Sequence, residues 1–223
     1  ADGSGAPQQL TRVPAFYTDV NWTPDGARLV ALRGSMKYRL ESPFAFGQTP
    51  GMDLVWLPAE GGDATVIIPS RGIGRPHFVE KEKDRIFLYS NQGLLSLRFD
   101  GTDRRNLLRV TGTGNYAAEE PVPASEVRAS PDGNWALAEV MNQLYLIALP
   151  QGVGAEAPTV NVNTPSVPVK KITDVGADYF DWMDGGKTLS WAIGASFFRQ
   201  PLETVSFDPP KKEEPKPDDK KPS

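Results

Sequence analysis

The sequence predicts an all-β chain of about four β-propeller blades, followed by a disordered C-terminal tail. Three observations support this: abundant Gly and Pro, a recurring turn motif, and short apolar strands at regular distances from each turn. The chain has 223 residues with 21 Gly and 21 Pro, and so many turn-forming residues favour short strands over long helices. Four-stranded propeller repeats run roughly 40–50 residues each, so the length suits about four.

The turn motif closes a predicted hairpin in each repeat. In Thr23–Gly26 and Ser130–Gly133, Pro fits the second position of a type I turn, Asp the third, and Gly a positive φ at the fourth. Met183–Gly186 keeps the Asp-Gly pair, and Glu80–Asp84 is a charged turn at the equivalent place that lacks the Pro-Asp-Gly sequence. A type I turn followed by a left-handed residue closes a hairpin with a bulge.

The residues just before these turns define the repeat spacing. Asn21, His77, Arg128 and Asp181 are equivalent and lie 56, 51 and 53 residues apart. A third strand is predicted after each hairpin, and a fourth after a further turn in the first three repeats. The third strands are Asp53–Leu57, Leu94–Phe99, Leu144–Leu149 and Ser196–Leu202, and the fourth are Thr65–Ile68, Asn106–Val110 and Val169–Thr173.

The two ends of the repeat array leave its closure open. An opening strand is expected at Gln8–Arg12, and the fourth strand of the last blade, at Thr204–Phe207, is doubtful. The opening strand could pair with the last blade and close a four-bladed ring, or the blades could form part of a larger ring with open edges. Long connections are expected at Arg33–Met52, Thr111–Ser125 and Gln151–Pro168.

Two regions follow from composition. Residues 1–208 are predicted to form the propeller blades, and residues 209–223 a Lys/Pro/acidic linker or tail without a hydrophobic residue. A segment of this kind cannot bury enough apolar surface to offset the entropy lost on ordering.

Charge and cysteine content exclude several function classes. A net charge of −4 lacks the basic surface that phosphate binding needs, so a nucleic-acid partner is not expected. No apolar run reaches membrane-spanning length. With no Cys and one His, the chain offers no thiolate metal site and little support for nucleophilic catalysis, so no metal or other cofactor is expected.

Candidate binding residues come from the repeat and the first long connection. His77, Arg128 and Asp181 are expected near a propeller channel as part of a binding rim, although a purely structural role for His77 is the stronger reading. Tyr38, Phe44 and Phe46 are apolar residues in the connection at Arg33–Met52. Tryptophans inside repeat strands are expected to pack between blades; they are Trp22, Trp135, Trp182 and Trp191.

Two sets of stretches resemble known families. Ser130–Trp135 and Asp181–Thr188 resemble the WD40-like repeats of TolB-type propellers. Gly93–Arg105, Asn142–Leu146 and Thr188–Gly194 resemble the N-terminal propeller region of bacterial exported amidohydrolases. The second resemblance covers about residues 8–208, and it implies export to the periplasm and a linker to a metal-dependent hydrolase barrel. That barrel needs a His-x-His pair and further ligands, and a chain with one His cannot supply them.

Three functions are therefore considered. The first is a non-catalytic propeller module that packs on, or gates, a metal-dependent amidohydrolase domain absent from this chain. The alternative is a free-standing TolB-like propeller that binds a protein or peptide. A propeller enzyme with its active site in the channel is the least favoured, because ionisable candidates are few.

Overall fold

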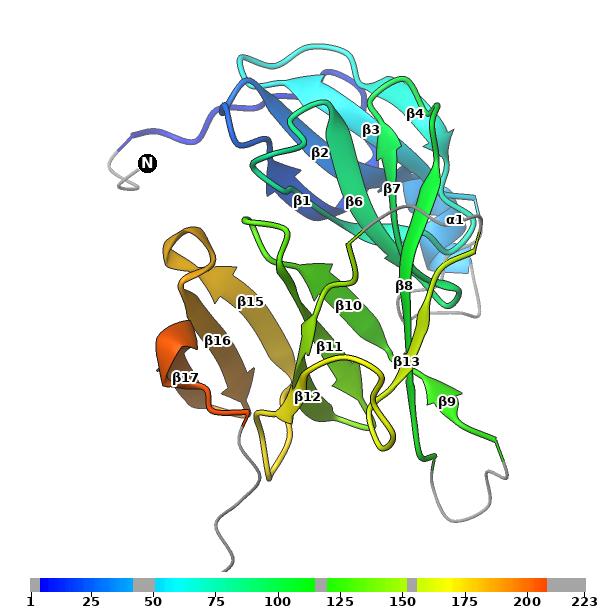
Figure 1. Ribbon diagram of the computed structural model, residues 1–223. Helices are drawn as coiled ribbons and strands as arrows, with labels where there is room; N and C mark the ends of the chain where they lie inside the picture. The colour runs from blue at the N-terminus through cyan, green and yellow to red at the C-terminus, as the bar shows by residue number, and fades with distance from the viewer. Residues whose placement is uncertain (1–4, 42–50, 115–119, 152–155, 208–223) are drawn as a thin grey trace, which may run out of the picture.

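The computed structural model describes residues 5–41, 51–114, 120–151 and 156–207 and is all-β, as the sequence predicts. Four antiparallel sheets follow one another along the chain and are called blades 1 to 4 (Figure 1). Blade 1 contains β1 (Phe16–Trp22), β2 (Arg28–Gly34), β3 (Asp53–Pro58) and β4 (Thr65–Pro69), and blade 2 contains β5 (Gly74–His77), β6 (Arg85–Ser90), β7 (Gly93–Arg98) and β8 (Arg105–Gly112). Blade 3 contains β10 (Glu126–Ala129), β11 (Trp135–Val140), β12 (Gln143–Ala148) and β14 (Val169–Lys171), and blade 4 contains β15 (Tyr179–Met183), β16 (Thr188–Ile193) and β17 (Ser196–Pro201).

The recurring turn has the predicted chemistry in blades 1 and 3. In blade 1 the Thr23 hydroxyl accepts the N–H of Arg28 at 3.0 Å, and Asp25 Oδ1 accepts the N–H of Ala27 at 3.0 Å. Gly26 takes the expected positive φ of 67°. In blade 3 the same bonds join Trp135 to Ser130 and Asn134 to Asp132, and Gly133 has a φ of 72°.

Apolar side chains fill the three spaces between consecutive blades. The core between blades 1 and 2 includes Val30, Leu54, Ile86 and Leu95. The cores between blades 2 and 3 and between blades 3 and 4 are built in the same way, from alternate residues of neighbouring sheets. Burial of these faces is the main stabilising contribution to the stack.

The blades form an open array. The inner strands β1, β5 and β10 contact one another in sequence, and within the described residues no strand pairing joins β15–β17 to β1–β4 (Figure 1). The strand expected at Gln8–Arg12 is wrong, because these residues form no ladder. Instead the carbonyl oxygen of Leu10 accepts the N–H of Gly62, in the turn between β3 and β4 of blade 1.

Residues 10–15 contact blade 1 at two places. The Leu10 carbonyl oxygen accepts the N–H of Gly62, and Val13 and Ala15 line a small hollow together with Tyr17 and Asp53. The face of blade 1 that points away from blade 2 has a small apolar cluster at its centre, against which Tyr17 and Ala64 pack. Its members are almost completely withdrawn from solvent: Ala31, Val55 and Leu57. Val13, in contrast, is 65% exposed.

The end of the array differs from the start. Blade 4 has three strands, and the doubtful fourth strand at Thr204–Phe207 is not formed. A 3-10 turn at Leu202–Thr204 (η2) turns the chain inward, and Val205 packs into the core between blades 3 and 4. Phe207 stacks on Trp135 with ring centroids 5.2 Å apart.

The long connections contain short elements that the sequence did not indicate. The first carries helix α1 (Met36–Glu41), the second β9 (Val122–Pro123), and the third β13 (Thr159–Asn161), which pairs in parallel with β8. No helix in the described residues is long and apolar enough to cross a membrane.

Of the four tryptophans that were predicted to pack between blades, three do so. Trp135, Trp182 and Trp191 line the core between blades 3 and 4. Trp22 does not, since it lies on the outward face of blade 1 and is 51% exposed. It pairs across the hairpin with Leu29 and has no neighbouring blade on that side.

Candidate functional site

The residues that the repeat makes equivalent lie on the inner strands and join each blade to the next. Each of the first three reaches the inner strand of the following blade through its side chain. The contacts are Asn21 Nδ2 to the Pro76 carbonyl oxygen at 3.0 Å, the Ala129 N–H to His77 Nε2 at 2.9 Å, and Arg128 Nη1 to Asp181 Oδ2 at 3.0 Å.

His77 is a buried bridge between blades 2 and 3. Its Nε2 accepts the N–H of Ala129, so its Nδ1 carries the proton and donates to the carbonyl oxygen of Arg75 at 2.9 Å. Burial lowers the pKa of His77 to about 4, against a smaller opposing effect of its bond to Arg75. The imidazole is therefore neutral at pH 7, and both of its nitrogens are engaged within the protein.

Five charged side chains form a continuous row across the inner strands of all four blades. Arg75 of β5 lies at its centre, 3.1 Å from an oxygen of Asp19 and 3.0 Å from an oxygen of Glu126. Glu126 also contacts Arg128 Nε at 2.5 Å, and Arg128 reaches Asp181. Arg128 and Asp181 thus lie together as expected, while their role as a binding rim stays a prediction.

Three members of this row were not predicted from the sequence, although each stands at the same distance from a repeat position. Asp19, Arg75 and Glu126 each precede the repeat position by two residues. Side chains two apart in a regular strand point to the same face, which places Glu126 with Arg128. Irregular pairing in β1 and β5 interrupts this alternation at Asp19 and Arg75. Asp19 and Arg75 also share a positive φ, 52° and 55°, beside irregular pairing in β1 and β5. Bulges of this kind re-aim side chains.

The row perturbs the ionisation of its members and neighbours. Burial alone would lower the pKa of Arg128, but the charges of Glu126 and Asp181 outweigh it and raise the pKa. Glu139, which faces Glu126 across the hairpin, has its pKa raised by burial and by the Glu126 charge. Arg128 is therefore firmly charged, and Glu139 is easier to protonate than an ordinary glutamate.

A cleft of about 520 Å³ opens elsewhere, between the turns of blades 1 and 2. It lies where the β1–β2 turn of blade 1 faces the β5–β6 and β7–β8 turns of blade 2. Its lining is mixed in charge and has two apolar walls, Pro24 and Phe99. The charged lining residues are Asp25, Arg28, Lys83, Asp84, Arg98 and Asp100.

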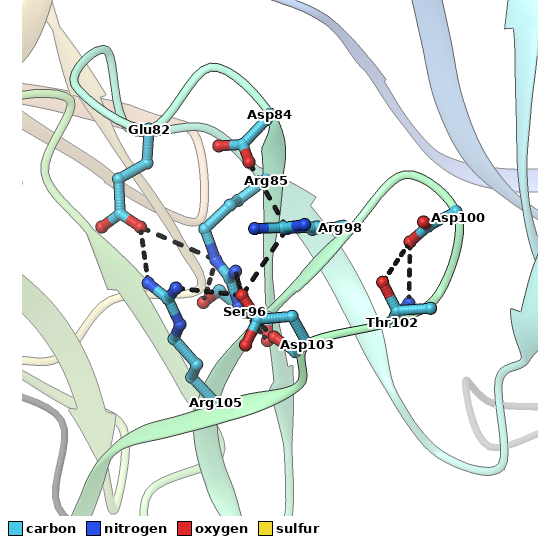
Figure 2. Close-up of polar contacts among 9 residues, drawn as sticks. All are labelled: Glu82, Asp84, Arg85, Ser96, Arg98, Asp100, Thr102, Asp103 and Arg105. Carbon is cyan, nitrogen blue, oxygen red and sulfur yellow. Dashed lines mark hydrogen bonds and ion pairs between the residues drawn. The ribbon is translucent and has the colours of Figure 1, made fainter.

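One side of the cleft borders a dense polar cluster in blade 2 (Figure 2). Its centre is the buried Arg85, whose Nη1 lies 2.7 Å from Asp103 Oδ2 and whose Nε donates to Ser96 Oγ at 3.0 Å. The bonds from Arg85 and Arg105 lower the pKa of Asp103. This cluster anchors the β7–β8 turn and so fixes the position of Asp100 and Phe99 at the cleft.

The remaining predicted residues give no further site. Tyr38 lies in α1, and Phe44 and Phe46 lie outside the described residues. The resemblance implies a metal centre in a hydrolase domain, and the described part of this chain contains no cluster of three or more His, Cys, Asp or Glu side chains that could hold a metal ion.

Comparisons with known proteins support the fold and no finer assignment. No family model and no curated protein matches the sequence. An oligogalacturonate lyase solved in complex with manganese is similar in structure, with a TM-score of 0.51 and 12% identity over 82% of this chain and 49% of that one. A putative 6-phosphogluconolactonase from Bacteroides fragilis also matches, with a TM-score of 0.37 and 14% identity over 80% of this chain and 48% of that one.

The lyase has a β-propeller fold, and this chain spans about half the length of each of the two structures. At this identity the likeness to the lyase concerns the fold alone. The chain is thus a propeller-like array of four blades, and the resemblance of its sequence to exported amidohydrolases stays a prediction.

Proposed function

We propose that this chain is a non-catalytic propeller module that packs, through the outer face of blade 4, on a metal-dependent amidohydrolase domain not contained in it. The observation that carries the proposal is an uncovered apolar row on that face. Tyr179, Ala192 and Phe197 are direct cross-strand neighbours on β15, β16 and β17. Tyr179 is 78% and Phe197 57% exposed.

The outward faces of the two end blades differ in how far their apolar side chains are exposed to solvent. The centre of the outward face of blade 1 is buried, with Tyr17 and Ala64 packed against it, whereas the aromatic row of blade 4 faces solvent. In repeat architectures a terminal unit needs a cap or a polar outer face, and exposed contiguous aromatic side chains indicate an interface. Aromatic side chains are also typical anchors of protein–protein interfaces.

The partner is inferred from the resemblance, which joins such propellers to a hydrolase barrel. The charged residues of the inner row support a structural role in this chain, since each one is paired with another and serves to join blades. The same resemblance leads us to propose export, with the periplasm as the working compartment.

The test is binding of the chain to an amidohydrolase domain from the same source, supplied as a separate polypeptide, by isothermal titration calorimetry. The double variant Tyr179→Lys/Phe197→Lys is expected to weaken binding by about tenfold or more, as loss of aromatic anchors does. The matched control is Val66→Lys, an exposed apolar position on the outward face of blade 1. Absence of binding, or an equal loss in the control, would refute the proposal.

A free-standing propeller that binds a protein or peptide is the second candidate. The cleft between blades 1 and 2 favours it, because a loop-lined hollow on a rigid scaffold is a usual place for ligand binding. Light scattering separates the two candidates. A monomer at all concentrations favours the free-standing binder, whereas self-association that the Tyr179→Lys/Phe197→Lys variant removes favours the module.

A further inference from the structure

The cleft between blades 1 and 2 has a charge arrangement that the fold does not require. Its volume of about 520 Å³ falls within the range of roughly 300–1,000 Å³ that small-ligand sites occupy. Three turns from two blades form it, and the polar cluster around Arg85 holds two of them in place. It is separate from the outer face of blade 4.

Two cations of the cleft form no close ion pair in the described part of the chain, although the charge of Arg28 acts on the nearby Asp25 carboxylate. Arg28 and Lys83 make no ion pair within the described residues, in contrast to Arg98, which contacts Asp84 and Asp103 at 3.6 Å. The Arg28 guanidinium instead lies 4.4 Å from the ring centroid of Trp56 and 5.1 Å from that of Phe99. Contact with aromatic faces orients a planar guanidinium and leaves its edge N–H groups available for in-plane hydrogen bonds.

Two carboxylates of the cleft are each engaged through one oxygen atom. Asp25 Oδ1 accepts bonds from the Thr23 hydroxyl at 2.6 Å and the Ala27 N–H at 3.0 Å. Asp100 Oδ1 is bonded in the same way by the hydroxyl and N–H of Thr102, as Figure 2 shows. These hydroxyl and backbone bonds lower the pKa of both Asp25 and Asp100. No hydrogen bond within the described residues engages the Oδ2 atom of Asp25 or of Asp100, so the cleft offers a ligand these acceptors as well as the donors of Arg28 and Lys83.

The acids also limit the charge that the cleft accepts. The negative charges of Asp25, Asp84 and Asp100 equal in number the positive charges of the three basic residues in the lining. These carboxylates repel a doubly charged anion such as phosphate more strongly than they repel a singly charged carboxylate. Pro24 and Phe99 offer apolar contact to the groups next to that carboxylate. We infer that the cleft binds a peptide through one carboxylate, held by the Arg28 guanidinium and the Lys83 ammonium group. This inference deepens the second candidate function and does not depend on blade 4.

The test is an NMR titration of the full chain with defined peptides at neutral pH. The probes are acetyl-Ala-Glu-Ala-amide, acetyl-Ala-Ala-Ala with a free C-terminus, the neutral acetyl-Ala-Ala-Ala-amide, and inorganic phosphate. Shift changes are expected at the Arg28 Nε–H and the backbone amides of Phe99 and Asp100, with either carboxylate peptide. Tighter binding of the Glu peptide would show that the cleft prefers a side-chain carboxylate. Tighter binding of the peptide with the free C-terminus would show that it prefers the carboxylate of a chain end.

Variants link the binding to the two cations. Lys83→Gln is expected to weaken binding about two- to fivefold, the size of an exposed ion pair, and Arg28→Gln about tenfold or more, as loss of a charge-assisted bidentate pair does. Lys81→Gln, exposed and outside the cleft, is the matched control. A thermal melt checks that Arg28→Gln still folds, and Lys83→Gln keeps the test valid if it does not.

Three results would overturn the inference while leaving the module proposal intact. They are equal binding of the neutral peptide, tighter binding of phosphate than of either carboxylate peptide, and no saturable shift at the cleft with any probe. A loss in Lys81→Gln equal to that in Lys83→Gln would do the same, because it would show a general charge effect.

Discussion

Arg85 is the most deeply buried basic side chain in the described part of the chain, at 2% exposure. Its guanidinium donates to Asp103, to Ser96 Oγ and to the Ser96 carbonyl oxygen (Figure 2). Removing it would leave the polar atoms of Ser96 buried without a partner, and such atoms are costly to leave unbonded.

Arg85→Met is therefore expected to lower the free energy of unfolding by about 2–4 kcal/mol. Arg98→Met is the matched control, because Arg98 belongs to the same cluster but is half exposed, and its loss should cost less than about 1 kcal/mol. Urea denaturation of both variants measures the difference. Equal effects would mean that the buried bonds of Arg85 contribute no more than surface pairs.

His77 is expected to make stability depend on pH in a defined window. Its pKa is about 4 in the folded chain and ordinarily 6.5, so the unfolded chain binds more protons between these values. The stability is fully present above pH 6.5 and falls as the pH drops, by up to about 3 kcal/mol at pH 4. The charge of Arg128 lowers the pKa of His77 and the charge of Asp181 raises it, so these two effects oppose each other.

The variant His77→Gln isolates this contribution. Glutamine can still accept the N–H of Ala129 and does not titrate, so its unfolding free energy should change less between pH 6.5 and 5, where most carboxylates stay ionised. Denaturant melts of both proteins across this range provide the measurement. Parallel pH profiles would show that His77 is not the group that titrates.

At the scale of single elements, close packing of the hairpins makes the cost of replacing a glycine depend on its position. Gly93, the first residue of β7, has a φ of 120°, and a Cβ there would clash with the Leu108 carbonyl oxygen. Gly26, in the first repeat turn, has a φ of 67° and open space around it. The first therefore faces both strain and a backbone clash, and the second faces strain alone.

Gly26→Ala is expected to cost about 1 kcal/mol, the strain of a left-handed residue. Gly93→Ala should cost about 3 kcal/mol or more, because β7 and β8 must separate to admit the methyl group. Thermal or urea unfolding of the two variants tests this order. A smaller cost for Gly93→Ala would mean that the β7–β8 pairing adapts easily.

The same elements show what the sequence could reveal. Strands beside a Pro-Asp-Gly turn were predictable, because local turn chemistry and period-two alternation determine them. β13 was not predictable, since its three residues gain order only by parallel pairing with β8, some 50 residues earlier. Gln8–Arg12 has strand composition but lies against a turn of blade 1, a tertiary contact that overrides local preference.

For the candidate sites, prediction from the sequence was limited because residues far apart along the chain meet only in the folded structure. The repeat located Asn21, His77, Arg128 and Asp181, and the strand period would have added Glu126, two residues before Arg128 in β10. The cleft could not be foreseen, because Arg28, Lys83 and Phe99 meet only through the way blades 1 and 2 stack. No spacing rule within one repeat encodes that contact.

For the whole molecule, the open array makes the contacts of the N-terminal segment with blade 1 a stabilising element of that end. Residues 10–15 contact blade 1 through the Leu10–Gly62 bond and the hollow lined by Val13 and Ala15. Removing residues 1–13 would break this bond, and the loss of one such hydrogen bond costs about 1 kcal/mol.

The truncated chain is therefore expected to melt roughly 2–4 °C lower. The control is deletion of residues 209–223, a segment without hydrophobic residues that the sequence predicts to be a linker or tail. Its removal should leave the melting temperature unchanged. If both deletions lowered the melting temperature equally, the tail would contribute to the folded blades, and the proposed boundary at residue 208 would be wrong.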